Sequence, residues 1–411
     1  MGRKKSLTLF VCIGLVLIFV SLLLLPTLGV AQSKASEAKK LKIGGLICLT
    51  GWFSSMDVQM GNELLILQDM INSRGGINIK GQKYEIEVVI EDCKSTLDGV
   101  SAATNALIYD KKVQFAIGPA AFFARASAPI TNQNKVLDVL GYCVLTPEEI
   151  GPGQPYTFSG LGGSAARLLS GVKYLKANFP NVKNLCMLSP AGGINKNLEA
   201  FMRENLGANG FNIVGEWVVF PDDASDWSPF AAKINANKQA DAVFWLNCIT
   251  FHVGNMVKSL REIGYDKWVF AWSNAPAADV MKITGKDAAQ KLVVQAFTPF
   301  AKGNPSDLDE VIRSSQSKYG KDVPIYFETA NPLYILVQII QKAQSIDPTV
   351  VKKTWEAMDG QKVNSLFGPG YISGTKTYGI KGHGLGHAHP HQKLDKGVIT
   401  DAGWYDSGPL P

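Results

Sequence analysis

From Leu41 onward, the chain alternates short apolar runs with longer stretches in which apolar residues recur every three or four positions. Short apolar runs predict strands, and the longer periodic stretches predict amphipathic helices. The first part of the chain is expected to form strands at 41–49, 84–91, 113–117 and 136–145, and helices at 60–74, 96–111 and 123–134. Because these strands are apolar on both faces, they indicate a parallel sheet covered by helices on both sides.

The same pattern begins again after a segment rich in glycine and aromatic residues at 155–163. It predicts strands at 182–188, 211–220, 241–246 and 268–272, with helices at 165–179, 196–209, 229–237 and 252–263. After Gly285 the order changes to a returning strand at 292–300, helices at 307–319, 327–343 and 348–358, and a glycine-rich tail of short strands. We therefore expect an α/β fold of two doubly wound parallel-sheet lobes, with a ligand cleft between them at the carboxyl ends of the strands.

The N-terminus has the pattern of an export signal. Arg3, Lys4 and Lys5 precede an apolar run over 7–30, and the run ends in small residues that a signal peptidase accepts. This order predicts a signal peptide at 1–31, cleaved after Ala31 and followed by a flexible tether at 32–40. An uncleaved membrane tether is the alternative, because the apolar run is long enough to span a bilayer.

Charge and cysteine content narrow the class of protein further. The chain has 41 Lys and Arg against 35 Asp and Glu, and cleavage of the signal would lower the net charge from +6 to +3. The basic residues are scattered, whereas a nucleic-acid binder concentrates them in a patch, so no nucleic-acid partner is expected. Five cysteines remain after cleavage, widely spaced in strand-like runs, which indicates buried thiols with at most one or two disulfides.

No motif for catalysis is present. The sequence lacks a phosphate-binding P-loop, a zinc-protease HExxH and a GxSxG nucleophile elbow. The segment Gly160-Leu161-Gly162-Gly163 lacks the third, more distant glycine of a dinucleotide-binding loop. The acidic pairs at loops and strand ends have no partner for acid–base catalysis. We therefore expect neither an enzyme nor a bound cofactor.

The histidines are the remaining candidates for special chemistry. His383, His387, His389 and His391 cluster near the C-terminus, and an extended chain would place the last three on one side, as in a zinc or nickel site. No cysteine or acidic ligand accompanies them, so the favoured interpretation is loop polarity, with no metal bound. His252 stands alone at a helix start, where packing or capping is expected.

Several segments occur in an order and spacing that resemble the branched-chain amino acid (Leu/Ile/Val) binding family of periplasmic solute-binding proteins. The resemblance extends over nearly the whole mature chain. The segments are Leu49-Thr50-Gly51, residues 69–77 (DMINSRGGI), Glu91-Asp92-Cys93, residues 116–119 (AIGP), Asp226-Trp227-Ser228 and residues 241–244 (DAVF).

This resemblance implies a type I periplasmic binding protein, in which two lobes joined by three crossing strands close over a small ligand. It implies a monomer that docks on an ABC-transporter permease in the inner membrane. On this basis residues 41–157 form the first part of the N-lobe, 158–290 the C-lobe, and 291–345 the second part of the N-lobe. Residues 346–411 return to the C-lobe and carry the histidine-rich tail.

The resemblance also locates a ligand site, and there the sequence departs from the family. Members that hold amino acids grip the carboxylate with a Ser after the third strand and a Thr after the fourth, where this chain has alanines, phenylalanines and Tyr142. The position of the family's acidic partner for the ammonium falls near Ser273 and Asn274. A buried ammonium without a carboxylate is costly, so we expect a hydrophobic or aromatic ligand.

The residues expected to bind this ligand lie in loops at strand ends. Trp52 and Phe122 are the strongest candidates, because each follows a strand's carboxyl end. The full set is Trp52, Phe53, Ala120, Ala121, Phe122, Phe123, Tyr142, Ile194, Asn247, Cys248, Ser273 and Asn274. The leading hypothesis is a receptor for an importer; the alternatives are a receptor of the same fold that serves a sensor, a secreted hydrolase, and a metal-binding protein.

Overall fold

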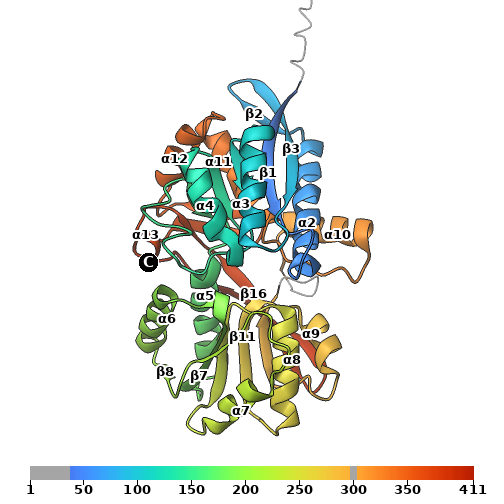
Figure 1. Cartoon of the computed structure of the whole chain (residues 1–411), viewed down its shortest axis with the longest axis vertical. Helices are drawn as coiled ribbons and strands as arrows, with labels where there is room; N and C mark the ends of the chain where they lie inside the picture. The colour runs from blue at the N-terminus through green and yellow to red at the C-terminus, as the bar shows by residue number, and fades with distance from the viewer. Residues whose placement is uncertain (1–37, 297–302) are drawn as a thin grey trace, which may run out of the picture. The chain divides into compact units, whose positions relative to one another are not determined.

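The structure is a computed structural model that describes residues 38–296 and 303–411 (Figure 1). The expected signal peptide lies outside the described residues. Within them, no helix combines the length and the apolar character that a membrane crossing requires.

The first sheet has six strands, five of them parallel. β1 lies in its middle and pairs in parallel with β3 and β4, and Ile47 at its end lies opposite Asp92. In spatial order the strands are β2 (Ile77–Ile79), β3 (Gln82–Asp92), β1 (Lys39–Ile47), β4 (Phe115–Ile117), β5 (Leu137–Leu140) and β6 (Thr157–Ser159).

The edge strand β2 was not predicted. It forms a hairpin with β3 through Lys80 and Gly81, which both have positive φ, the backbone of a tight hairpin turn. Three residues are too few to show a period-two pattern, so only the turn at Lys80 and Gly81 could have indicated this strand in the sequence.

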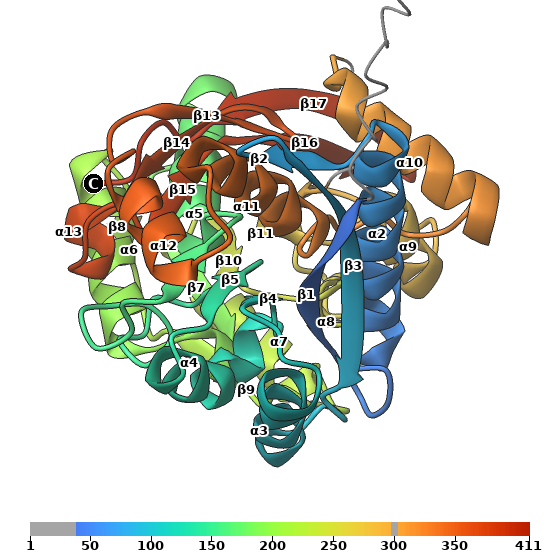
Figure 2. The ribbon, with the colours of Figure 1, turned by 90° about the horizontal axis from the view of Figure 1, so that it is seen from above.

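Helices cover both faces of the first sheet. Figure 2 shows α2 (Ser54–Ser73) and α11 (Ala330–Ala343) on one face, and α3 (Leu97–Asn105) and α4 (Ala124–Gln133) on the other. α10 (Ser306–Tyr319) packs beside α2, and α12 (Pro348–Glu356) packs beside α11. Apolar side chains of α2, α10, α11 and α12 form one buried core with those of β1, β4 and β5.

The second sheet is also mostly parallel, with an antiparallel edge. In spatial order its strands are β17 (Val398–Asp406), β16 (Ala388–Asp395), β12 (Leu292–Gln295), β11 (Trp268–Asn274), β10 (Ala242–Leu246), β7 (Asn184–Pro190) and β8 (Asn212–Ile213), and β9 (Val218–Phe220) also pairs with β7. One face is covered by α5 (Gly163–Asn178) and α6 (Lys196–Ala208). The other is covered by α7 (Ser228–Ala236), α8 (Thr250–Glu262) and α9 (Ala277–Thr284).

Two expectations about the later part of the chain are wrong. β12 was expected in the first lobe, but it lies between β11 and β16 in the second sheet. Residues 346–386 were expected to return to the second lobe, but Trp355, Leu366 and Leu385 lie in the core of the first. Of residues 346–411, only β16 and β17 join the second sheet, where β16 pairs antiparallel with β12 and β17 pairs antiparallel with β16.

The chain passes between the lobes three times, which confirms the two-lobed α/β fold. The passages follow β6, β12 and β15 (Gly384–Gly386). β15 belongs to a small antiparallel sheet with β13 (Lys362–Ser365) and β14 (Gly368–Ser373), and a short helix, α13 (Thr375–Tyr378), separates β14 from β15.

The four clustered histidines are buried, so the expectation of loop polarity is wrong. The ring of His387 stacks on that of His389 at 4.2 Å, and His391 stacks on Tyr174 at 4.6 Å. Among the described residues, no three His, Cys, Asp or Glu side chains are placed to hold a metal ion. The isolated His252 is also buried, and it packs on Phe220, as expected for a packing role.

Burial of these imidazoles predicts a dependence of stability on pH. Burial lowers the pKa of His391 to about 3, against about 6.5 in an unfolded chain. The unfolded state therefore binds the proton first, and the stabilisation that is present above pH 6.5 is lost as the pH falls. At pH 5 the expected loss is about 2 kcal/mol for this residue.

The measurement is urea unfolding of wild type and His391→Gln at pH 7 and pH 5. A comparison with the variant is needed because burial also raises the pKa of Asp57 to about 7 and that of Glu63 to about 8. These acids change stability in the opposite direction over the same pH range. We expect the stability difference between wild type and variant to shrink by about 2 kcal/mol at pH 5; an unchanged difference would show that His391 is not buried in its neutral form.

Candidate ligand site

A narrow cavity lies where strand ends of the two sheets meet. Its volume is about 30 Å³, and most of its lining is apolar or aromatic. The lining residues are Phe53, Met56, Ala120, Phe122, Tyr142, Val144, Asn247, Cys248, Ile249, Ser273 and Glu328. The cavity thus occupies the position where open α/β sheets bind ligands, at the carboxyl ends of β1, β4, β5, β10 and β11.

Two helical segments begin beside this cavity. Cys248 and Ile249 directly precede α8, and Ala120 directly precedes the 3-10 turn η2 (Ala121–Phe123). Backbone N–H groups at a helix start carry a partial positive charge. The start of α8 therefore favours an acceptor or anionic group in the cavity beside it.

Four aromatic rings of the first lobe form a cluster at the cavity. Phe53 contacts Phe122 with ring centres 5.8 Å apart, and Trp52 packs edge-on against both. Phe53 and Phe122 line the cavity, whereas Phe123 is buried in the core behind them. Trp52 covers the cluster from outside and is 49% exposed.

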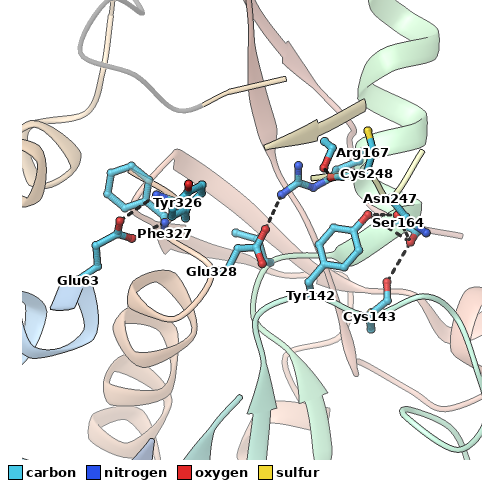
Figure 3. Close-up of polar contacts among 12 residues, drawn as sticks. Glu63, Tyr142, Cys143, Ser164, Arg167, Asn247, Cys248, Tyr326, Phe327 and Glu328 are labelled. Atoms are coloured by element: carbon cyan, nitrogen blue, oxygen red, sulfur yellow. Dashed lines mark hydrogen bonds and ion pairs between the residues drawn. The ribbon is translucent and has the colours of Figure 1, made fainter. Parts of the chain in front are cut away.

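A hydrogen bond joins the two lobes across the cavity. The Tyr142 hydroxyl, from the loop after β5, donates to Oδ1 of Asn247, which follows β10 (Figure 3). Ser164, at the start of α5, donates to the same oxygen at 2.9 Å. The Asn247 amide donates to the carbonyl oxygen of Gly193, so the side chain is fixed from three sides.

Removal of the Tyr142 hydroxyl tests this link. We expect Tyr142→Phe to lower the free energy of unfolding by about 1 kcal/mol, because the ring still packs but one buried hydrogen bond is lost. The control is Tyr109→Phe, since the Tyr109 hydroxyl also bonds an asparagine, Asn134, at 3.0 Å, but Tyr109 is 53% exposed. Urea unfolding measures both; equal effects of the two substitutions would argue against a special role of the link.

An ion pair lies beside the link. Nη2 of Arg167, from α5, is 3.2 Å from Oε1 of Glu328, and the guanidinium lies over the ring of Tyr142, 4.9 Å from its centre (Figure 3). Both side chains are shielded from water, with exposed fractions of 1% and 14%. Burial raises the pKa of Glu328, and the charge of Arg167 opposes this rise.

The backbone that carries Glu328 is held from α2. The two side-chain oxygens of Glu63 accept hydrogen bonds from the N–H groups of Tyr326 and Phe327, and the Thr329 hydroxyl donates to the carbonyl oxygen of Met60. Phe327 has a positive φ, so the turn has an unusual backbone that these bonds stabilise. These bonds therefore fix the backbone position from which the Glu328 side chain reaches the cavity.

Seven of the residues predicted for the ligand site line the cavity. They are Phe53, Ala120, Phe122, Tyr142, Asn247, Cys248 and Ser273. Trp52 and Phe123 are outside the lining, and Ile194 packs against the core of the second lobe. The structure does not describe the side chains of Ala121 and Asn274.

Four lining residues were missed by the sequence analysis: Met56, Val144, Ile249 and Glu328. For Glu328 a signal was present, because it is a single charged residue in the otherwise uncharged stretch 323–341. A lone charge in such a stretch needs a buried partner or a function. For the other three, no feature of the sequence separated them from core residues.

The fold and the cavity define the class of a two-lobed solute-binding protein. The chain belongs to the periplasmic binding protein family, whose model matches residues 40–382. A search of curated protein sequences gave no match.

Solved structures of the same fold include receptors for different solutes. A leucine-binding protein, LivK, from Thermotoga maritima is 17% identical, with a TM-score of 0.70 and coverage of 89% of this chain and 98% of that one. A solute-binding protein of an ABC transporter from Rhodopseudomonas palustris, in complex with 3,4-dihydroxybenzoic acid, is 22% identical, with a TM-score of 0.68 and coverage of 90% and 99%. A second protein from that organism, in complex with 4-hydroxybenzoate, is 17% identical, with a TM-score of 0.71 and coverage of 91% and 98%.

Proposed function

We propose that this protein is the periplasmic receptor of an ABC importer and binds a small hydrophobic or aromatic solute between its lobes. The observation that carries the proposal is the cavity itself, in which aromatic and aliphatic side chains of both lobes surround a few fixed polar groups. Such a lining is typical of sites for small apolar molecules. The bound receptor would then dock on a permease in the inner membrane.

An aromatic acid fits both sides of this cavity. Phe53 and Phe122 offer ring faces and edges, while the helix starts at Ile249 and Ala120 offer N–H groups to a carboxylate. Two of the similar structures hold hydroxylated benzoic acids, which supports the same class of solute here.

The site holds a carboxylate that was not expected from the sequence, because Glu328 lines the cavity. Arg167 already pairs with it, so a ligand ammonium would have to share this carboxylate with a buried guanidinium. We therefore retain the apolar or aromatic solute as the proposal and include amino acids in the test.

Binding is expected to require opening of the lobes. The cavity of about 30 Å³ is much smaller than the roughly 150 Å³ that admit a benzene ring in an engineered protein core. A ring can enter only if the lobes move apart, and hinge closure would then bury it.

Thermal unfolding with a ligand panel tests this function on protein purified after expression of the full-length chain. The panel contains leucine, valine, phenylalanine, benzoate, a hydroxybenzoate, benzamide and zinc chloride. A compound at a hundred times its dissociation constant should add about 2.7 kcal/mol of stability. We expect aromatic compounds to stabilise the protein; stabilisation by leucine or valine alone would overturn the proposed solute class, and stabilisation by zinc alone would overturn the receptor function.

A further inference from the structure

Glu328 is the one charged side chain among the described residues that line the cavity. Its neighbours there are largely apolar, and its backbone is fixed by Glu63 from α2. A charged group in an apolar cavity is costly unless it has partners. Packing alone therefore does not explain why a glutamate lies at this position.

The other polar side chains of the cavity already have acceptors within the protein. The Tyr142 hydroxyl donates to Asn247, and the Asn247 amide donates to Gly193. The Ser273 hydroxyl donates to the carbonyl oxygen of Cys248. These bonds use the hydroxyl protons of Tyr142 and Ser273 and one of the two amide N–H groups of Asn247.

The Glu328 carboxylate has accepting capacity left. Its Oε1 receives Nη2 of Arg167 at 3.2 Å, and no described residue is hydrogen-bonded to its Oε2. A carboxylate offers about four acceptor positions, so one ion-pair contact leaves most of them open. The cavity therefore presents an acceptor to a ligand at this end.

Charge decides which kind of donor fits. Arg167 balances Glu328, so the pair as a whole is neutral and buried. A ligand carboxylate at this end would be repelled by Glu328, and a ligand ammonium would lie close to the guanidinium. A neutral hydroxyl or amide N–H meets neither penalty, and its bond to an ionised acceptor is stronger than one to a neutral group.

We propose that Glu328 selects the ligand, by accepting a hydrogen bond from a neutral donor, a hydroxyl or amide N–H, on a small apolar or aromatic molecule. This inference rests on the proposed function, because it names the solute class of the same cavity. Arg167 acts as a positioning residue, since it holds the carboxylate in place without lining the cavity.

The test compares size-matched compounds that differ only in the donor. Phenol is compared with toluene, and benzamide with acetophenone, because a methyl group replaces the hydroxyl or the amide NH2 at nearly equal volume. Isothermal titration calorimetry on wild-type protein should show about 10-fold or greater preference for the donor compound of each pair, from the usual strength of a hydrogen bond to a charged group. Toluene is the more hydrophobic of its pair, so a preference for phenol cannot come from apolar burial.

Variants then assign the preference to Glu328. In Glu328→Gln we expect the ratio within each pair to fall below about 3-fold, since the acceptor is no longer charged. The control is Glu262→Gln, an exposed glutamate in the last turn of α8, which should leave both ratios unchanged. If Glu328→Gln does not fold, the affinity ratios of the two compound pairs on wild-type protein still test the inference.

Each result has a definite meaning. Equal affinity within both pairs, or tighter binding of benzylamine than of benzamide, would overturn the inference while the receptor function stands. Unchanged ratios in a folded Glu328→Gln variant would also overturn it. If wild type bound none of these compounds and no member of the first panel, the proposed function itself would fail, and the inference with it.

Discussion

Replacement of Arg167 by methionine is expected to lower the free energy of unfolding by about 3 kcal/mol, the usual cost of removing one partner of a buried ion pair. Arg167 is 1% exposed, and its loss leaves Glu328 in the cavity without a countercharge. Methionine fills much of the same volume, so the expected loss reports the charge and not a void.

The loss should depend on pH in a defined direction. Burial already raises the pKa of Glu328, and removal of Arg167 would raise it further. The folded variant then retains a proton that the unfolded chain releases near pH 4.5, so its stability falls as the pH rises. The deficit of Arg167→Met relative to wild type is therefore expected to be larger at pH 8 than at pH 5.

Two further variants control this prediction, with urea unfolding as the measurement. Arg203→Met breaks an exposed ion pair with Glu199, in which Arg203 is 52% exposed, and should cost less than about 1 kcal/mol. The double variant Arg167→Met/Glu328→Met removes both charges and should recover most of the stability. If the double variant is as unstable as Arg167→Met, the loss comes from packing, and our account of the pair is wrong.

Substitution of Gly141 by alanine is expected to be at least as damaging, and it should abolish ligand binding. An added Cβ at this position would lie 1.7 Å from the carbonyl oxygen of Glu328 and 2.7 Å from its carbonyl carbon. The obstacle is backbone that Glu63 holds in place, so the turn at 326–329 must move. We expect a loss of about 3 kcal/mol, at the upper end of the usual cost of overpacking.

Gly207 provides the matched control for this substitution. It lies in α6, and nothing is within 4 Å of its added Cβ. Gly207→Ala should therefore be neutral or raise stability by up to about 1 kcal/mol, as alanine favours a helix. If Gly141→Ala behaved like Gly207→Ala in urea unfolding, the close approach of the two segments would be contradicted.

The sequence predicted the elements whose patterns are long enough to show a period. The alternation of apolar strands and amphipathic helices is confirmed in β1, α2, β10 and α8, because burial on one or both faces dictates their composition. The assignment of β12 was wrong because an apolar strand fits either sheet. Its neighbours β11 and β16 are set by tertiary pairing, which leaves no local signal.

Most lining residues in loops directly after predicted strands could be predicted from the sequence. The lining residue from the later part of the chain, Glu328, could not. Phe53, Phe122 and Tyr142 follow predicted strands and line the cavity. Glu328 comes from a turn before α11, far along the chain, and only its charge in an apolar stretch distinguished it. The burial of the histidines was not predicted, because loop polarity was inferred from the lack of Cys or acidic ligands among them, whereas His389 and His391 lie in β16.

The central claim is that a small solute binds between the lobes, and hydrogen–deuterium exchange tests it most directly. The protein is compared with and without the panel compound that raises its melting temperature most. We predict slower exchange in lining segments of both lobes, around Phe53, Phe122 and Tyr142 in the first and around Asn247 and Ser273 in the second. Protection confined to one lobe, or to residues 383–391, would contradict it.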